Sequence, residues 1–263
     1  MNQQISIGEF LMMYQYMAYF SDPITTACAI LMRYRANMVH VARIDKLSDD
    51  AKIPKETKKY MTNTENLFFT EKYDFYKGKE KTDFLFHIDK LKIKKGGLYV
   101  IKGENGSGKS MFLNLLFGNV KLSFSRGGFI LTAEMDEAAF LTYPIFTVDG
   151  DFMKNMYEIP IDKELMHLLQ VDFSDKEILS NPVNLSYGQQ QKLALLRVFG
   201  LNSPILFLDE PLSNLDKKTQ ENVVAYIRKL KGEKTILVVM HSDELDEAAD
   251  SVIYIENKKL IQK

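Results

Sequence analysis

The segment "GENGSGKS", residues 103–110, follows the apolar run "LYVI" and precedes a stretch with helical character. It fits the pattern G-x-x-x-x-G-K-[ST], in which Gly103, Gly108, Lys109 and Ser110 hold the fixed positions. Glycines let backbone N–H groups turn inward and wrap a phosphate chain at the N-terminus of a helix. A lysine at this position neutralises outer phosphates, and the serine hydroxyl ligates Mg²⁺. The segment therefore predicts a phosphate-binding loop between a buried strand and a helix over 109–117.

A pair of acids lies well downstream of this loop. Asp209 and Glu210 end the apolar run "ILFLDE". An aspartate at a strand end can hold Mg²⁺ through water, and a neighbouring glutamate can act as a general base on an attacking water. Adjacent acids at a strand end also occur as ordinary surface residues. Their place after a phosphate loop favours the magnesium and general-base roles.

The composition limits the classes of partner. The 263 residues are 46% hydrophobic, which is enough for one full domain with a core and a smaller segment. The formal net charge of −1 gives no overall positive field, so no nucleic-acid partner is expected. Cys28 is the one cysteine of the chain, which excludes an internal disulfide framework and, without a cysteine–histidine cluster, makes a structural zinc site improbable.

Hydrophobic patterning after residue 66 predicts strands that alternate with helices. Two long runs, "LFFTEKYDFY" and "FLFHIDKLKI", are typical of strands, and 135–200 has a mostly helical pattern. A helix is expected over "KKTQENVVAYIRKLKG", between two short apolar strands. Such alternation favours a largely parallel sheet with both faces covered. The short buried strands are expected at "LYVI", "FILTA", "PILFLDE" and "TILVVMH".

The N-terminal segment has a different character. An apolar run from about residue 8 to 32 is long enough to cross a hydrocarbon core of about 30 Å, and basic residues follow it, which places the C-terminal bulk in the cytosol. Asp22 and Pro23 lie inside the run, so two soluble or interfacial helices, the second starting at Pro23, are the alternative. The expected organisation is a membrane helix in 1–46, a polar linker in 47–66 and a globular domain in 67–263.

Further motifs between and after the two nucleotide motifs identify a family. "LSYGQ" (residues 185–189) resembles the signature of ATP-binding-cassette (ABC) ATPases, and "SNLD" (213–216) and His241 follow in the family's order. The resemblance covers about residues 67 to 263. It implies an α/β fold: a P-loop NTPase cassette whose mixed sheet core carries an antiparallel β subdomain and a helical subdomain, preceded here by a long N-terminal helix.

The resemblance also implies roles for individual residues. It makes ATP and Mg²⁺ the cofactors and makes Glu210, His241 and Lys109 the catalytic residues. In this family the signature helix faces a nucleotide held by the opposite subunit, so a second ABC subunit is an implied partner. Metal contacts are implied for Ser110, Asp209 and Glu134. Nucleotide contacts are implied for Gly103, Asn105, Gly106, Ser107, Gly108, Lys109, Ser110, Met111 and Tyr76, and across the dimer for Ser186, Gly188, Gln189 and Asp216.

Some positions depart from the family pattern or compete for a role. Glu134, after "FILTA", stands where the family usually has a glutamine; a carboxylate can bind Mg²⁺ but cannot donate a hydrogen bond. Tyr187 replaces a signature glycine. Tyr76 is the first choice for stacking on adenine, with Tyr73 next and Phe75 in competition.

The N-terminal segment resembles the last transmembrane helix of fused ABC exporters, on Gly8, Pro23 and Arg43-Ile44. This implies an ATPase subunit at the cell membrane, with the ATPase domain on the cytoplasmic face and a partner that supplies the remaining membrane helices. Export of peptides or lipophilic compounds is the expected function. Two alternatives are a soluble cassette of the chromosome-maintenance type, against which the missing heptad array argues, and a non-transport ABC protein that binds ATP as a regulatory module.

Overall fold

The computed structural model divides into two units, Met1–Pro54 and Lys55–Lys263. In the first unit, residues 7, 8, 10, 12 and 16 are helical and exposed. The rest of the predicted membrane segment lies outside the described residues. No helix within the described part of the chain combines the length and apolar character that a bilayer crossing requires. The described residues are 7, 8, 10, 12, 16, 59–60, 65–77, 83–117, 122–123, 130–131, 137–141, 143–157 and 159–263.

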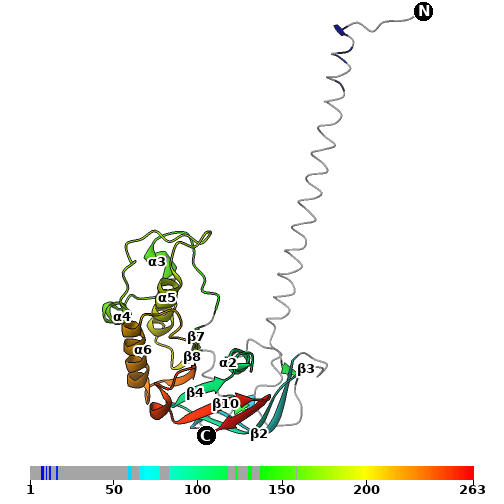
Figure 1. Cartoon of the computed structure of the whole chain (residues 1–263), viewed down its shortest axis with the longest axis vertical. Helices are drawn as coiled ribbons and strands as arrows, with labels where there is room; N and C mark the ends of the chain where they lie inside the picture. The colour runs from blue at the N-terminus through cyan, green and yellow to red at the C-terminus, as the bar shows by residue number, and fades with distance from the viewer. Residues whose placement is uncertain are drawn as a thin grey trace, which may run out of the picture. The chain divides into compact units, whose positions relative to one another are not determined.

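One mixed sheet forms the centre of the second unit, and helices pack against it (Figure 1). Among the described residues it has eleven strands, in the order β1-β6-β2-β3-β11-β10-β4-β9-β8-β7, with β5 paired to β2. Strands β10, β4, β9, β8 and β7 run parallel, whereas β2 pairs antiparallel with β3, β5 and β6. The strands are β1 Lys59–Tyr60, β2 Asn66–Lys77, β3 Asp83–Lys94, β4 Leu98–Gly103, β5 Leu122–Ser123, β6 Ile130–Leu131, β7 Ala138–Leu141, β8 Ile205–Asp209, β9 Thr235–Val239, β10 Ser251–Glu256 and β11 Lys259–Gln262.

The central strands are buried on both faces, which explains their continuous apolar sequences. In β4, Leu98 and Val100 pack into one hydrophobic cluster, and Tyr99 and Ile101 into the other. The same alternation holds in β8, where Leu206 and Leu208 face opposite to Ile205 and Phe207. A strand with two buried faces is rigid, so the loops at its carboxyl end start from fixed positions.

Helices cover this sheet in two groups. The helix α2 shares a cluster with Phe207 of β8 through its buried Phe112 and Leu116. The remaining helices gather together in a helical part (Figure 1), from which α5 and α6 share the other hydrophobic cluster with β4 and β8. The helices are α2 Lys109–Phe117, α3 Phe152–Asn155, α4 Lys163–Leu168, α5 Tyr187–Gly200 and α6 Lys217–Leu230, with a 3-10 turn η3 at Asp246–Ala248.

Most strand and helix predictions are confirmed, namely β2, β3, β4, β8, β9, α2 and α6. Two differ. The run "FILTA" contributes only β6 among the described residues, and β6 pairs with β1 and β2, away from β8. The strand beside β8 is β7, in a region predicted to be mostly helical. Its four residues are too short for a periodic pattern to separate strand from helix.

Candidate functional site

The glycine loop between β4 and α2 is shaped by close backbone contacts. A Cβ atom on Gly103 would lie 2.6 Å from the Ile255 carbonyl oxygen of β10. At Gly108, with φ +99°, a Cβ would lie 2.6 Å from the Phe86 ring. Side chains would collide at both positions, and a φ of this sign strongly favours glycine. The curvature of the loop therefore depends on the two glycines that the motif fixes.

The ammonium group of Lys109 lies inside this loop. Its side chain is buried, and Nζ donates to the carbonyl oxygens of Gly103 at 2.9 Å and Glu104 at 3.0 Å. The Ser107 N–H donates to the Glu104 carbonyl at 3.1 Å. The lysine charge is thus held in the loop at the N-terminus of α2, and a cation beside a helix N-terminus favours an anion.

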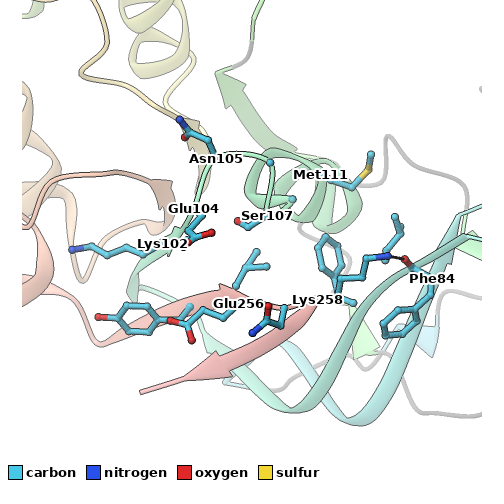
Figure 2. A pocket seen from close by; sticks show the side chains of 16 residues that line it. Phe84, Lys102, Glu104, Asn105, Ser107, Met111, Glu256 and Lys258 are labelled. Atoms are coloured by element: carbon cyan, nitrogen blue, oxygen red, sulfur yellow. Dashed lines mark hydrogen bonds between the residues drawn. The ribbon is translucent and has the colours of Figure 1, made fainter.

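A cavity of about 840 Å³ lies beside the loop (Figure 2). Glu104, Asn105 and Ser107 line it from the loop, and Met111 lines it from α2. Phe84 lies across from them on β3, where the Lys258 ammonium donates to its carbonyl oxygen at 3.2 Å. The cavity is lined by the glycine loop and by aromatic residues such as Phe84 and Phe86, together with the charged side chains of Lys102, Glu256 and Lys258.

Asp209 ends β8 and meets the loop. Burial raises the pKa of Asp209 and the neighbouring Glu210 charge adds to this, while a hydrogen bond from the Ser110 hydroxyl and the charge of Lys109 lower it. Asp209 is 8% exposed, and its Oδ1 has no hydrogen-bond partner among the residues that the structure describes. A buried carboxylate oxygen of this kind fits a magnesium ion or a water of its shell.

Glu210 begins the turn after β8 in a left-handed conformation, with φ 48°. Its Oε1 lies 3.2 Å from Nε2 of His241, which follows β9. Its Oε2 accepts from the Ser213 hydroxyl at 3.1 Å. The structure therefore brings together two of the three predicted catalytic residues, Glu210 and His241, and adds Ser213.

The signature residues begin α5. Ser186 caps the helix: its hydroxyl accepts from the Gln189 N–H at 3.2 Å, and the Gln189 side chain accepts from the Ser186 N–H. A Cβ on Gly188 would lie 2.7 Å from the Asn214 carbonyl oxygen, so this glycine lets α5 approach the turn after β8. Tyr187 is 74% exposed and its side chain is open to solvent.

Asp216, predicted to couple two sites, is the N-cap of α6. It accepts from the Thr219 N–H at 3.0 Å and the Thr219 hydroxyl at 2.7 Å, and these bonds lower the pKa of Asp216. Its Oδ2 lies 3.6 Å from the Lys192 ammonium on α5. Within one chain, Asp216 therefore connects α5 to α6.

The three aromatic candidates on β2 differ in burial. Tyr73 and Phe75 are fully buried in the core. Tyr76 keeps exposed surface, and its ring lies 5.5 Å from the Phe84 ring, which borders the cavity. Of the three, Tyr76 is the residue that a ligand can reach.

The metal-ligand prediction for Glu134 falls outside the described residues. It depended on a strand at "FILTA" that leads to the site, whereas the strand adjoining β8 is β7. Two residues beyond β7 is Tyr143, whose hydroxyl is hydrogen-bonded to the fully buried Gln191. Neither residue was predictable from the sequence, because a tyrosine before a proline and the third of three successive glutamines carry no distinguishing local signal.

A glycine loop with a buried lysine, placed between a buried strand and a helix, is typical of P-loop nucleoside-triphosphate-binding domains. Within that class, the chain carries an ATP-binding domain of the ABC transporter family. Residues 86–213 match the family model described as "ABC transporter". ATP and Mg²⁺ are accordingly the ligands of this domain.

Several curated relatives are similar over much or all of the chain. A "Probable ABC transporter ATP-binding/permease protein" of Haemophilus influenzae is 31% identical over 65% of this chain and 35% of its own length. An ATP-dependent lipid A-core flippase of Mannheimia succiniciproducens is 23% identical over 100% of this chain and 49% of its own length. A lactococcin transport/processing ATP-binding protein LcnC-like of Lactococcus lactis is 26% identical over 100% and 39%. The chain spans half the length of these relatives or less.

Proposed function

We propose that this chain is the ATP-hydrolysing subunit of an ABC exporter. The observation that carries the site is the buried Lys109 ammonium inside the glycine loop, where Nζ donates to the carbonyl oxygens of Gly103 and Glu104. Ser110 and Asp209 would hold Mg²⁺, which supplies positive charge to the phosphates when bound. Lys109 and the loop amides would hold the phosphate chain. Tyr76, whose ring lies beside Phe84 on the wall of the cavity, would stack on the base.

Glu210 is proposed as the general base. Its two carboxylate oxygens have different neighbours, Ser213 and His241, so the carboxylate plane is fixed by two contacts. The side chain remains 42% exposed, so a water molecule can reach it. His241 would orient that water or a phosphate oxygen from the end of the neighbouring strand.

A second copy of the domain is proposed to complete each site. Ser186, Gly188 and Gln189 begin α5, and helix N-termini favour anions. Figure 1 shows α5 in the helical part, apart from α2 and its phosphate loop. These signature residues are therefore proposed to face a nucleotide held by the other copy, with Asp216 connecting the two sites.

The exporter assignment is supported by the relatives whose similarity extends over the whole chain. Their names describe a lipid A-core flippase and a lactococcin transport/processing protein. We therefore propose export of a lipophilic compound or a peptide from a site at the cell membrane, with the ATPase domain on the cytoplasmic face. A partner chain would supply further membrane helices.

Hydrolysis of Mg-ATP by the full chain in detergent tests the ATPase part. Lys109→Ala is expected to weaken ATP binding by about 100-fold and to abolish turnover, because it removes a charge-assisted contact and loosens the loop. Lys176→Ala, on an exposed lysine, is the control and is expected to match the unaltered protein. Equal ATP affinity for Lys109→Ala would contradict the phosphate site.

Mixing two inactive variants tests the shared site. Ser186→Asp keeps a good helix cap but adds a negative charge that repels phosphate. Mixed with Lys109→Ala, it would form heterodimers with one doubly defective site and one intact site. Activity above that of either variant alone is expected, and no recovery would contradict a site built from two copies.

Alkaline extraction of membranes from expressing cells tests the location separately. The full chain is expected in the pellet when co-expressed with a membrane partner. Quantitative release into the supernatant would contradict the exporter assignment, while the ATPase assay would still stand.

A further inference from the structure

The loop after β7 brings a tyrosine to the acid end of β8. Strands β7 and β8 are parallel, with Leu141 opposite Leu208, so Tyr143 emerges next to Asp209 and Glu210. Burial raises the pKa of Tyr143, and the charges of Glu210 and Asp209 add to this, while a hydrogen bond from Asn214 lowers it. A tyrosine phenol is protonated at neutral pH and can donate a hydrogen bond.

A chain of hydrogen bonds leads from this phenol to the proposed general base. The Tyr143 hydroxyl donates to Oε1 of Gln191 and accepts from Nδ2 of Asn214 at 3.4 Å. Gln191 is fully buried in α5. Its Nε2 donates to the carbonyl oxygens of Glu210 at 3.3 Å and Pro211 at 3.0 Å. The buried amide thus uses its acceptor and both donors.

Glu210 needs this support because its backbone is strained. A left-handed conformation in a residue with a side chain costs about 1–2 kcal/mol, and Glu210 has φ 48°. Its N–H donates to the Val239 carbonyl at 3.2 Å, and its carbonyl accepts from the Ser213 N–H at 3.1 Å as well as from Gln191. The position of the Glu210 carboxylate therefore depends on contacts that hold its peptide groups.

We infer that Tyr143 is a positioning residue for ATP hydrolysis: its hydroxyl fixes the Gln191 amide, which holds the strained turn that carries Glu210. The inference rests on the proposed role of Glu210 as general base. Tyr143 does not itself act on the reacting atoms. Since Gln191 lies on the helix that begins with Ser186 and Gly188, the network also ties the signature end of α5 to the catalytic turn of the same chain.

The test is steady-state ATP hydrolysis by the full chain with Tyr143→Phe, which removes only the hydroxyl. The change leaves the buried Oε1 of Gln191 without its donor. Because the Gln191 amide then holds the Glu210 turn less firmly, kcat is expected to fall about tenfold. The KM and the measured affinity for ATP are expected to stay within about twofold, because no phosphate contact changes. Tyr157→Phe is the matched control, since the Tyr157 hydroxyl donates to the Phe146 carbonyl at 3.4 Å, outside the network.

Gln191→Met removes the amide at similar volume and tests whether Tyr143 acts through Gln191. It is expected to lower kcat at least as much as Tyr143→Phe, and the double variant is expected to show no further loss, because both act through one network. Unchanged kcat in Tyr143→Phe, an equal loss of ATP affinity, or full additivity in the double variant would overturn the inference. If Gln191→Met does not fold, the Tyr143→Phe result decides alone.

The outcomes separate this inference from the function on which it rests. An unaltered chain that neither binds nor hydrolyses ATP would remove both. An active unaltered chain whose Tyr143→Phe variant is equally active would leave the ATPase assignment standing and remove the positioning role.

Discussion

The imidazole Nε2 of His241 lies 3.2 Å from Oε1 of Glu210. The contact follows from the sheet: Asp209 of β8 pairs with Val239 of β9, so the residues after these strands emerge at the same edge. The Glu210 and His241 side chains are 42% and 52% exposed, although the strands beneath them are fully buried. Two polar side chains that are open to solvent thus follow directly after buried strands.

Replacing the carboxylate tests the role of Glu210. We expect Glu210→Gln to lower kcat for ATP by about 100-fold or more, because the amide cannot take a proton from water. ATP binding is expected to persist, and the variant is expected to accumulate as an ATP-bound dimer. Turnover by phosphate release and mass by light scattering with and without ATP check both effects.

Glu244→Gln provides the matched control, because Glu244 is an exposed acid on the segment after β9. It is expected to hydrolyse ATP at the unaltered rate. Hydrolysis by Glu210→Gln at that same rate would be incompatible with Glu210 as the general base.

The direction in which Gly188→Ala changes the Tm tests whether α5 closely approaches the turn after β8. In an ordinary helix, glycine to alanine stabilises by about 0.5–1 kcal/mol. We expect the opposite for Gly188→Ala, because the new Cβ would lie 2.7 Å from a backbone oxygen of Asn214. Thermal unfolding is expected to show a lower Tm, by several degrees. A Tm above that of the unaltered chain would show that the two segments are not in contact.

The stability of the antiparallel part is expected to depend on pH through His87. Hydrogen bonds to Asp74 at 2.6 Å and to Asp89 at 3.0 Å raise the pKa of His87 above its ordinary 6.5. Because the pKa of His87 is higher in the folded than in the unfolded protein, its hydrogen bonds to the two aspartates stabilise the fold fully below pH 6.5. This stabilisation is lost as the pH rises through the pKa of the folded protein. His87→Gln should therefore lower the Tm at about pH 5.5 and have less effect at about pH 9.

The effect is expected to be small, about 1–3 °C, because the His87 side chain is 36% exposed and solvent screens the pair. His167→Gln, on the exposed surface of α4, is the control for loss of an imidazole. A Tm difference for His87→Gln that grows with pH would reverse the assigned sign and exclude the His87–Asp74 pair as its cause.

The proposed stacking of Tyr76 on the base can be tested with two ligands. Tyr76→Leu is expected to weaken ATP binding by about tenfold through loss of stacking and to leave pyrophosphate binding unchanged. Tyr76→Phe keeps the ring and is expected to bind both ligands normally. Calorimetric titration measures these affinities. Equal losses for ATP and pyrophosphate in Tyr76→Leu would remove Tyr76 from the base site.

Parts of the site that depend on local sequence were predictable. The glycines at 103 and 108, the apolar strand before them and the helix after them follow from backbone sterics within a few residues. The apolar runs of β8 and β9 indicated buried strands and therefore the acid and the histidine at their ends. The Ser186 cap also follows from a local pattern, since a glutamine three residues later completes a capping box.

Other parts depend on pairing between distant segments. β7 is four residues long, and its place beside β8 is decided by packing between the two hydrophobic clusters. The His87–Asp74 pair arises from the alignment of β2 with β3, where these two residues are directly opposite. Gln191 acquires its role because α5 is fully buried at that turn against Glu210 and Pro211.

The amino-acid sequence by itself determined that a phosphate loop follows a buried strand, because φ angles and helix starts are set by neighbouring residues. Only the tertiary structure decided which strand adjoins the acids and which side chains hold Glu210 in place. Those contacts join residues about 20 to 70 positions apart, and no local pattern encodes which distant groups satisfy a buried amide.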